Sequence, residues 1–185
     1  PVSAHIICRS TAAGLLCAPM LADKERLNIR YTYSGLLRTI LVDVGQDGTV
    51  RSLVSPSQLS EQAGDRKALY GETCEITVVK TADSKILNSG TTSSIFQDEV
   101  DDLSFYFSYS DQIETGMVVM VGFQADVEQP VALCQGLKLQ ALPHCDLERF
   151  EKIRQRLNDP ACRERLMHPV VDRNGFEDIL RKILE

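Results

Sequence analysis

The stretch Ile95–Val121, with the sequence IFQDEVDDLSFYFSYSDQIETGMVVMV, decides the fold. Ser94 stands just before it and three residues ahead of Gln97, a spacing that predicts a capping box at the start of a helix. Gly116 predicts the end of a turn, and the apolar run Met117–Phe123 predicts a strand. The stretch combines a helix, a turn and a strand, and it carries no residue set suited to catalysis.

The predicted helix has an apolar face and an acidic first turn. Val100, Leu103 and Phe107 recur at three- and four-residue steps, so we expect them to pack on the core together with the neighbouring aromatic residues. Four carboxylates favour the positive end of the helix dipole: Asp98, Glu99, Asp101 and Asp102. A metal or general-acid site is the alternative, but no histidine or oxygen-ligand spacing accompanies these carboxylates. We therefore predict that they lie on a solvated face.

The segments on either side of this stretch predict more strands and one more helix. Periodicity over residues 2–21 predicts a largely buried helix that Pro19 bends or ends. Alternating or β-branched residues predict further strands: 27–33, 39–44, 50–54, 74–80, 86–92 and 133–142. Gly45 and Gly48 bracket the hairpin loop after the second of these strands. Residues 55–67, which are polar, predict a surface excursion.

The chain changes character after Pro143. Residues 146–157 and 176–184 predict amphipathic helices, with a proline-containing stretch between them, and Asn174 to Glu177 repeats the capping-box spacing. Two short helices cannot bury their apolar faces alone, so these faces must pack on the body, on a second copy or on a client protein. The candidate client-binding or dimer-contact residues are Phe150, Ile153, Leu157, Phe176, Ile179, Leu180, Ile183 and Leu184.

Charge and composition narrow the function. The chain has 185 residues and a net charge of -6, which argues against nucleic acid or an anionic membrane as a partner. No apolar run approaches the roughly 18 residues of a membrane span. The sequence contains no phosphate-binding glycine motif and no nucleophile motif, so we predict that it is not an enzyme. His144 beside Cys145 is the most tempting catalytic pair, but sequence neighbours in a loop seldom form a working dyad.

The six cysteines never fall in C-x-C or C-x-x-C spacing, so the local pattern of zinc sites and redox motifs is missing. Their positions are Cys8, Cys17, Cys74, Cys134, Cys145 and Cys162. Their dispersal over apolar segments predicts reduced, buried cysteines that act as small hydrophobic residues. This pattern favours a reducing compartment, either the cytoplasm or an organellar matrix.

Residues 98–121 resemble the heat shock protein 33 family, the redox-regulated 33 kDa chaperonin. In that family an acidic start, a Leu-x-Tyr/Phe-Tyr-Phe core and a Ser-x-Gln end recur, and here they are Leu103, Phe105, Tyr106, Phe107, Ser110 and Gln112. The resemblance continues in residues 12–21, 37–54 and 133–143. One departure is Cys134-Gln135-Gly136, which stands where the family usually has a small residue and paired glycines.

The resemblance implies an α+β fold, with a layered β/β/α core domain, a largely buried helix and amphipathic linker helices. The core domain would cover residues 1–143, with an N-terminal strand and helix of the family missing, and the helical linker would cover residues 144–185. The family's zinc domain, with its C-x-C and C-x-x-C thiolates, would begin beyond Glu185. We therefore expect no cofactor in this chain and zinc in that further domain.

The implied function is that of an ATP-independent holdase, which binds unfolded or partly folded client proteins under oxidative stress. The implied regulator is the zinc and cysteine switch outside this chain, and a homodimer is expected in the active state. The alternative is a constitutive protein-interaction domain of the same fold that lacks redox regulation.

Overall fold

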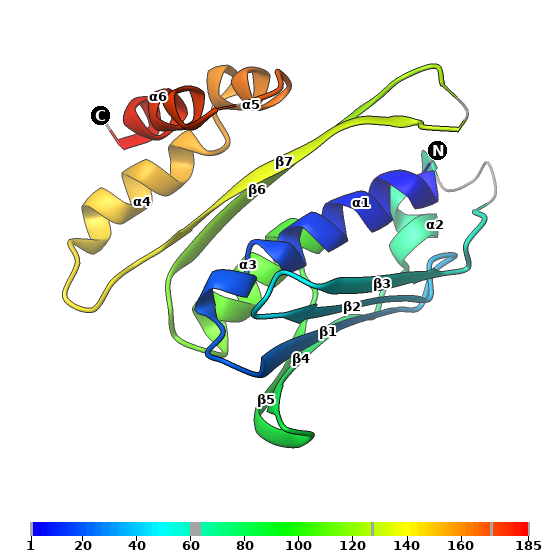
Figure 1. The fold of residues 1–185 in the computed structure, drawn as a ribbon. Helices are drawn as coiled ribbons and strands as arrows, with labels where there is room; N and C mark the ends of the chain where they lie inside the picture. Colours follow the sequence, from blue (N-terminus) through cyan, green and yellow to red (C-terminus); the bar gives the residue numbers. More distant parts are fainter. Residues whose placement is uncertain (1, 60–63, 127, 171, 185) are drawn as a thin grey trace.

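Two antiparallel sheets and six α-helices make up the part of the chain that the structure, a computed structural model, describes: residues 2–59, 64–126, 128–170 and 172–184 (Figure 1). The larger sheet has the strand order β3-β2-β1-β4-β5, and the smaller one pairs β6 with β7. The bounds of the strands are β1 Glu25–Tyr33, β2 Thr39–Gly45, β3 Val50–Ser55, β4 Cys74–Ala82, β5 Lys85–Ser93, β6 Thr115–Phe123 and β7 Val131–Gln140. The predicted α+β class is confirmed.

The central strands β1 and β2 of the five-stranded sheet follow an alternating pattern of burial. In β1 the side chains of Leu27, Ile29 and Tyr31 are buried, and the residues between them are exposed. The predicted pairing of β5 with β4 is confirmed, and Gly48 takes a φ of +78° in the hairpin between β2 and β3. Each predicted strand is present. A half-buried antiparallel strand leaves a period-two pattern in the sequence, as in β1 and β2, whereas the edge strands β3 and β5 are largely exposed.

Helix α1, Val2–Leu15, is shorter and less buried than predicted. It ends before Pro19, and the 3-10 helix Ala18–Met20 follows it. Cys17 donates its backbone N–H to the carbonyl of Gly14, which tightens the last turn, and proline has no N–H with which to continue the ladder. The buried residues of α1 form one stripe: Ile6, Ser10, Ala13 and Gly14.

Helices α1 and α3, Glu99–Tyr109, lie between the two sheets (Figure 1). The main core fills the space around them and combines side chains of the five-stranded sheet with Met117 and Val119 of β6. A short helix that the sequence analysis missed, α2 Arg66–Tyr70, begins at the end of the predicted surface excursion and adds Leu69 and Tyr70 to this core. Residues 60–63 of the excursion lie outside the described residues.

The predicted capping box of Ser94 and Gln97 is wrong. Asp98 is the N-cap of α3, and its carboxylate accepts a hydrogen bond of 3.0 Å from the backbone N–H of Val100. Asp102 accepts the N–H of Asp98 in return and also the hydroxyl of Ser94. Gln97 takes a φ of +51°, which excludes it from the helix. Carboxylates nearer to the free N–H groups form the cap instead.

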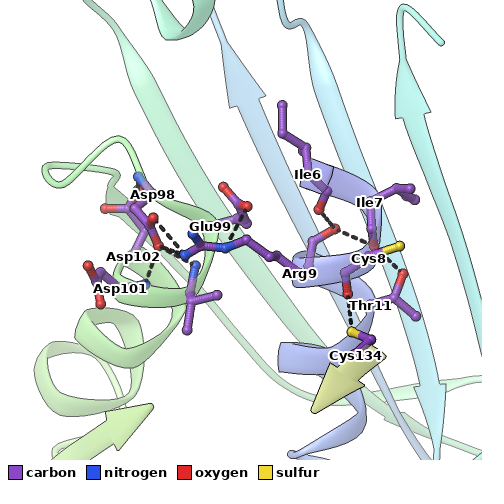
Figure 2. Close-up of polar contacts among 12 residues, drawn as sticks. Ile6, Ile7, Cys8, Arg9, Thr11, Asp98, Glu99, Asp101, Asp102 and Cys134 are labelled. Carbon is purple, nitrogen blue, oxygen red and sulfur yellow. Dashed lines mark hydrogen bonds and ion pairs between the residues drawn. The ribbon is translucent and has the colours of Figure 1, made fainter. Parts of the chain in front are cut away.

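The predicted solvated face of the acidic residues is also wrong for two of the four. Glu99 is 2% exposed and Asp102 is fully buried, whereas Asp101 is exposed. Asp102 is held by the hydroxyl of Ser94 and the backbone N–H of Asp98, whereas Glu99 pairs with Arg9. Arg9 reaches across from α1 and lies 2.7 Å from both carboxylate oxygens of Asp98 and 3.2 Å from Glu99 (Figure 2). These carboxylates join α3 to α1, because an arginine on the neighbouring helix offers them paired donors.

Burial raises the pKa of Glu99 from 4.5 to about 7, although Arg9 opposes the rise. Between these values the folded chain holds a proton that the unfolded chain has lost, so the free energy of unfolding should fall as the pH rises from 4.5 to 7. The limit of this fall is roughly 3 kcal/mol. Glu99→Gln should remove most of the slope, as measured by denaturant unfolding at several pH values. Glu75→Gln, at an exposed site on β4, should keep it, and an equal slope in both variants would contradict the assignment.

Candidate functional site: the interface between the tail helices and the β6–β7 ribbon

Strand β6 is buried on both faces. Met117, Val119 and Val121 belong to the main core, whereas Val118 and Met120 belong to a second, separate cluster on the opposite face. A strand that packs on both sides needs an unbroken apolar run rather than alternation. This requirement explains the run Met-Val-Val-Met-Val.

Strand β7, the partner of β6, separates its two faces by residue type. Leu137 and Leu139 pack in the second cluster. On the other face, a Cβ atom at Gly136 would come within 3.2 Å of Leu16, and Lys138 contacts Cys17, just after the end of α1. The two strands, here called the ribbon, therefore separate the main core from the second cluster.

Three helices, here called the tail helices, cover the outer face of this ribbon. They are α4 Leu147–Arg156, α5 Pro160–Leu166 and α6 Arg173–Leu184, and Figure 1 shows them in yellow, orange and red on the side away from α1. Leu157, Leu166, Ile179 and Ile183 are each 1 to 2% exposed and complete the second cluster. The tail helices thus pack on the body of the same chain.

The eight candidate residues divide into three groups at this interface. Buried are Leu157, Ile179 and Ile183, and half-buried are Phe150, Ile153 and Leu180. Phe176 and Leu184 are exposed by 41% and 48%. A cavity of about 360 Å³ beside Leu139 is lined by Phe150, Ile153 and Leu184. The structure therefore brings most of the candidates together around one surface and leaves Phe176 at its edge.

Two details of the tail helices differ from the sequence prediction. Helix α5 was not predicted, and it begins at Pro160, because proline is well suited to the first turn of a helix. Asn174 lies inside α6 rather than at its cap, so the second predicted capping box is wrong. Asp172 takes this role and accepts a 2.8 Å hydrogen bond from the backbone N–H of Gly175.

Polar contacts that the sequence analysis missed also hold the tail helices. The side-chain amide of Gln135, on β7, donates to the carbonyls of Leu166 at 2.7 Å and His168 at 2.8 Å. Arg156 donates to the carbonyl of Ile183 at 2.9 Å. The available signal was the departure at Cys134-Gln135-Gly136, which gives Gln135 a polar side chain on the tail face of the ribbon.

Glycine permits the close approach of α4 to the ribbon. A Cβ atom at Gly116 would lie 2.7 Å from Cγ of Arg154 and 3.1 Å from Leu157. Both distances are shorter than ordinary carbon contacts. Gly116 lies inside β6, which begins at Thr115 rather than after the glycine as predicted, and it makes room for α4.

The second cluster is much smaller than the main core. It contains six buried apolar residues, against 24 in the main core, and α4 contributes no buried residue within its own bounds. Segments with few buried apolar contacts open at lower free energy than the rest of a protein. The tail helices are therefore the part of the described fold with the weakest attachment.

A row of aromatic residues lies exposed beside this interface. Phe96 meets Phe105 edge to face with ring centres 5.8 Å apart, and Phe105 stacks on Tyr109 at 5.4 Å. Phe96 and Tyr109 are 48% and 69% exposed. The prediction that the aromatics of this stretch are core residues is confirmed for Tyr106 and Phe107 and wrong for this row, because helical periodicity places the row on the opposite face.

The six cysteines are dispersed over the structure and differ in burial. Cys17 and Cys74 are buried as predicted, but Cys134 is exposed and the others are half-buried. Burial raises the thiol pKa of Cys8, Cys17, Cys134 and Cys162, and at Cys17 the neighbouring Lys138 opposes the rise. Within the residues that the structure describes, no group of three metal-ligating side chains comes together, and no helix is long and apolar enough to cross a membrane.

Comparisons with known proteins agree on one family. A family model described as Hsp33 protein matches residues 1–185. A 33 kDa chaperonin from Gloeobacter violaceus is 32% identical over 158 residues, which are 82% of this chain and 51% of that protein. A 33 kDa chaperonin from Bacillus subtilis is 26% identical over 163 residues, which are 85% of this chain and 55% of that protein. The chain thus spans about half the length of these relatives.

A solved structure agrees on the fold. The crystal structure of the 33 kDa chaperonin from Thermotoga maritima, a heat shock protein 33 homologue, matches with a TM-score of 0.77 and 21% sequence identity. The match covers 94% of this chain and 61% of that one. At this identity the match concerns the arrangement of the elements.

Ile179→Ala should loosen the tail helices selectively. Truncation of a buried isoleucine costs about 2 to 5 kcal/mol, and here the loss falls on the small second cluster. We expect hydrogen exchange of the backbone amides in α4–α6 to accelerate while exchange in β1 stays unchanged. Leu184→Ala, at a half-exposed site of the same helix, is the control and should change exchange little. Equal acceleration in β1 would mean that the tail and the main core unfold as one unit.

Proposed function

The chain belongs to the Hsp33 protein family, and from this premise we propose that it acts as a chaperone that holds unfolded proteins without ATP. Relatives that share this family carry the name 33 kDa chaperonin. A holdase needs apolar surface that is covered at rest and becomes available when clients unfold. The observation that carries the proposal is the outer face of the ribbon, which is apolar and is covered by the weakly attached tail helices.

Release of the tail helices would uncover two apolar surfaces at once. One is the outer face of the ribbon, with Val118 and Leu137 at its centre. The other is the inner face of the tail helices themselves, with Leu157, Ile179 and Ile183. Unfolded clients expose apolar side chains in varied sequences, and apolar contact is non-directional, so such surfaces suit clients of many kinds. The eight candidate residues are proposed as client contacts in this released state.

The exposed aromatic row offers a first contact even while the tail helices are docked. Phe96 and Phe105 line a cavity of about 290 Å³ together with Leu157 at the end of α4, and Tyr109 stacks on Phe105. Aromatic rings contribute large contact areas with little loss of side-chain freedom. A client bound there would lie next to the surface that the tail helices cover.

We further propose that oxidative stress controls this release in the full-length protein. The family resemblance implies a zinc and cysteine switch, but the described residues of this chain do not fit a zinc site, since no three ligand side chains converge. Any zinc-dependent control would therefore use cysteines other than the six present here. The protein-interaction domain without redox control is the competing proposal.

A homodimer is proposed for the released state. The inner faces of α4 and α6 that pack on the ribbon of their own chain could pack in the same way on the ribbon of a second copy, which is the usual route to exchange of an element. Sedimentation of Ile179→Ala should then show a species of twice the mass of one chain, in larger amount than for the unchanged protein. A strictly monomeric variant would contradict this proposal.

The holdase proposal is tested by suppression of aggregation. We expect Ile179→Ala to protect thermally unfolding citrate synthase better than the unchanged chain at equal concentration without an oxidant, because its tail helices are released. Adding Val118→Ser to Ile179→Ala should reduce the gain several-fold, since a hydroxyl replaces apolar surface at the centre of the uncovered face. Light scattering gives the measurement, and Leu184→Ala serves as the control with unchanged docking.

The outcomes separate the competing proposals. Protection by the unchanged chain that is the same with and without peroxide would favour a constitutive holdase. If no variant protects the client although hydrogen exchange reports released tail helices, the holdase proposal is wrong and an interaction domain is favoured.

A further inference from the structure

A lysine and a cysteine meet in the layer between α1 and β7. The Nζ of Lys138 lies 3.6 Å from the Sγ of Cys17. The same ammonium group contacts the sulfur of Met20 and lies 4.5 Å from the centre of the Phe107 ring. Cys17 is fully buried and Lys138 is partly buried. Among the described residues, no carboxylate lies within ion-pair distance of this ammonium group, so two sulfurs and an aromatic ring are its neighbours.

This environment favours the neutral amine over the ammonium ion. Sulfur is a weak hydrogen-bond acceptor, and buried lysines are ordinarily paired with carboxylates. Burial lowers the pKa of Lys138, although Cys17 and Asp111 oppose the change. When it loses its proton, the amine of Lys138 carries a free lone pair 3.6 Å from the sulfur of Cys17. Neither the fold nor the proposed chaperone function uses this pair.

We propose that Cys17 and Lys138 form a covalent sulfur–nitrogen bond, a sulfenamide, when the protein meets a peroxide. In the first step the thiol of Cys17 is oxidised to a sulfenic acid, while the O–O bond of hydrogen peroxide breaks and water leaves. In the second step the lone pair of the Lys138 nitrogen attacks the sulfur, the S–N bond forms, the S–O bond breaks, and the oxygen leaves with a proton from nitrogen as water. One thiol, one amine and one peroxide thus give one S–N bond and two waters.

The geometry supplies both proximity and access. Nitrogen and sulfur 3.6 Å apart are nearly in van der Waals contact, close to the separation at which held groups react. A cavity of about 90 Å³ is lined by Cys17, Met20 and Phe107, and Asn88 and Asp111 line its polar side. A single water needs roughly 10 to 15 Å³ by the same kind of measure, so a peroxide molecule fits.

The bond would fasten the end of α1 to the inner face of the ribbon. It leaves the outer face, where the tail helices dock, without any new contact, so the proposal stands independently of the holdase function. It would also protect Cys17 from further, irreversible oxidation, because the sulfur is no longer a sulfenic acid.

One competing reaction must be separated from it. Cys134 on β7 lies near Cys8 of α1, but its Sγ is directed at the backbone carbonyl of Cys8, 3.6 Å away (Figure 2). A disulfide between these two residues would change the mass by the same amount as the S–N bond. The test therefore uses a chain that carries Cys8→Ser and Cys134→Ser.

The experiment treats this chain with hydrogen peroxide and measures its intact mass and its tryptic peptides. We expect a loss of about 2 Da, one linked peptide that joins Cys17 to Lys138 with no cleavage after Lys138, and full reversal by dithiothreitol. Adding Lys138→Arg keeps the charge and should abolish the linked peptide. Lys138→Met is a second variant without a nucleophile, and it fits the apolar surroundings if the larger arginine prevents folding.

Two results would overturn the proposal. One is a gain of about 16 or 32 Da on Cys17 with normal cleavage after Lys138, because the sulfur would then have been oxidised without capture by the amine. The other is a loss of about 2 Da that persists in Lys138→Arg or Lys138→Met, because another nucleophile would then have attacked the sulfur. Circular dichroism of each variant establishes that the comparison is between folded chains.

Discussion

The packing of strand β6 on both of its faces is the constraint on which the rest of the structure depends. Met117 and Val119 pack in the main core with α1 and α3. Val118 and Met120 point to the opposite face and pack against the tail helices. The same strand therefore stabilises the main core and also forms part of the candidate functional surface. A change in the position of β6 would displace side chains in both the main core and the second cluster, because closely packed interiors transmit strain.

Much of the fold could be predicted because its elements bury one face each. The central strands β1 and β2 of the larger sheet alternate, and α3 carries a stripe at helical spacing, so local pattern and tertiary environment agree there. The predictions failed where a distant residue decides the local structure. Arg9, far from α3 in the sequence, pairs with the N-cap Asp98 and with the buried Glu99 of the first turn. The helix start at Asp98 depends on which nearby oxygen reaches each N–H, and spacing alone does not reveal this.

The candidate site was predictable in kind and less so in detail. Amphipathic periodicity identified Leu157, Ile179 and Ile183, because a helix that docks through one face keeps its apolar residues three or four apart. The periodicity could not show which surface these residues cover, because β6 is apolar on both faces and its sequence does not indicate which face meets the tail helices. The role of Gln135 was not predicted, because a single polar residue in a strand is ordinarily exposed. Only the fold shows that its side chain donates to carbonyls at the end of α5 and just after it.

The division of β7 into two faces has a consequence for how the ribbon finds its alignment. Strand β6 is apolar on both faces. A shift of its pairing register by one residue would therefore still place apolar side chains in both cores. Strand β7 does not tolerate such a shift, since it would turn Lys138 toward the tail helices and Leu137 and Leu139 toward α1. Strand β7, which has polar and apolar faces, therefore sets the register of its pairing with the uniformly apolar β6. The least hydrophobic positions of the ribbon thus make the pairing of the two strands unique.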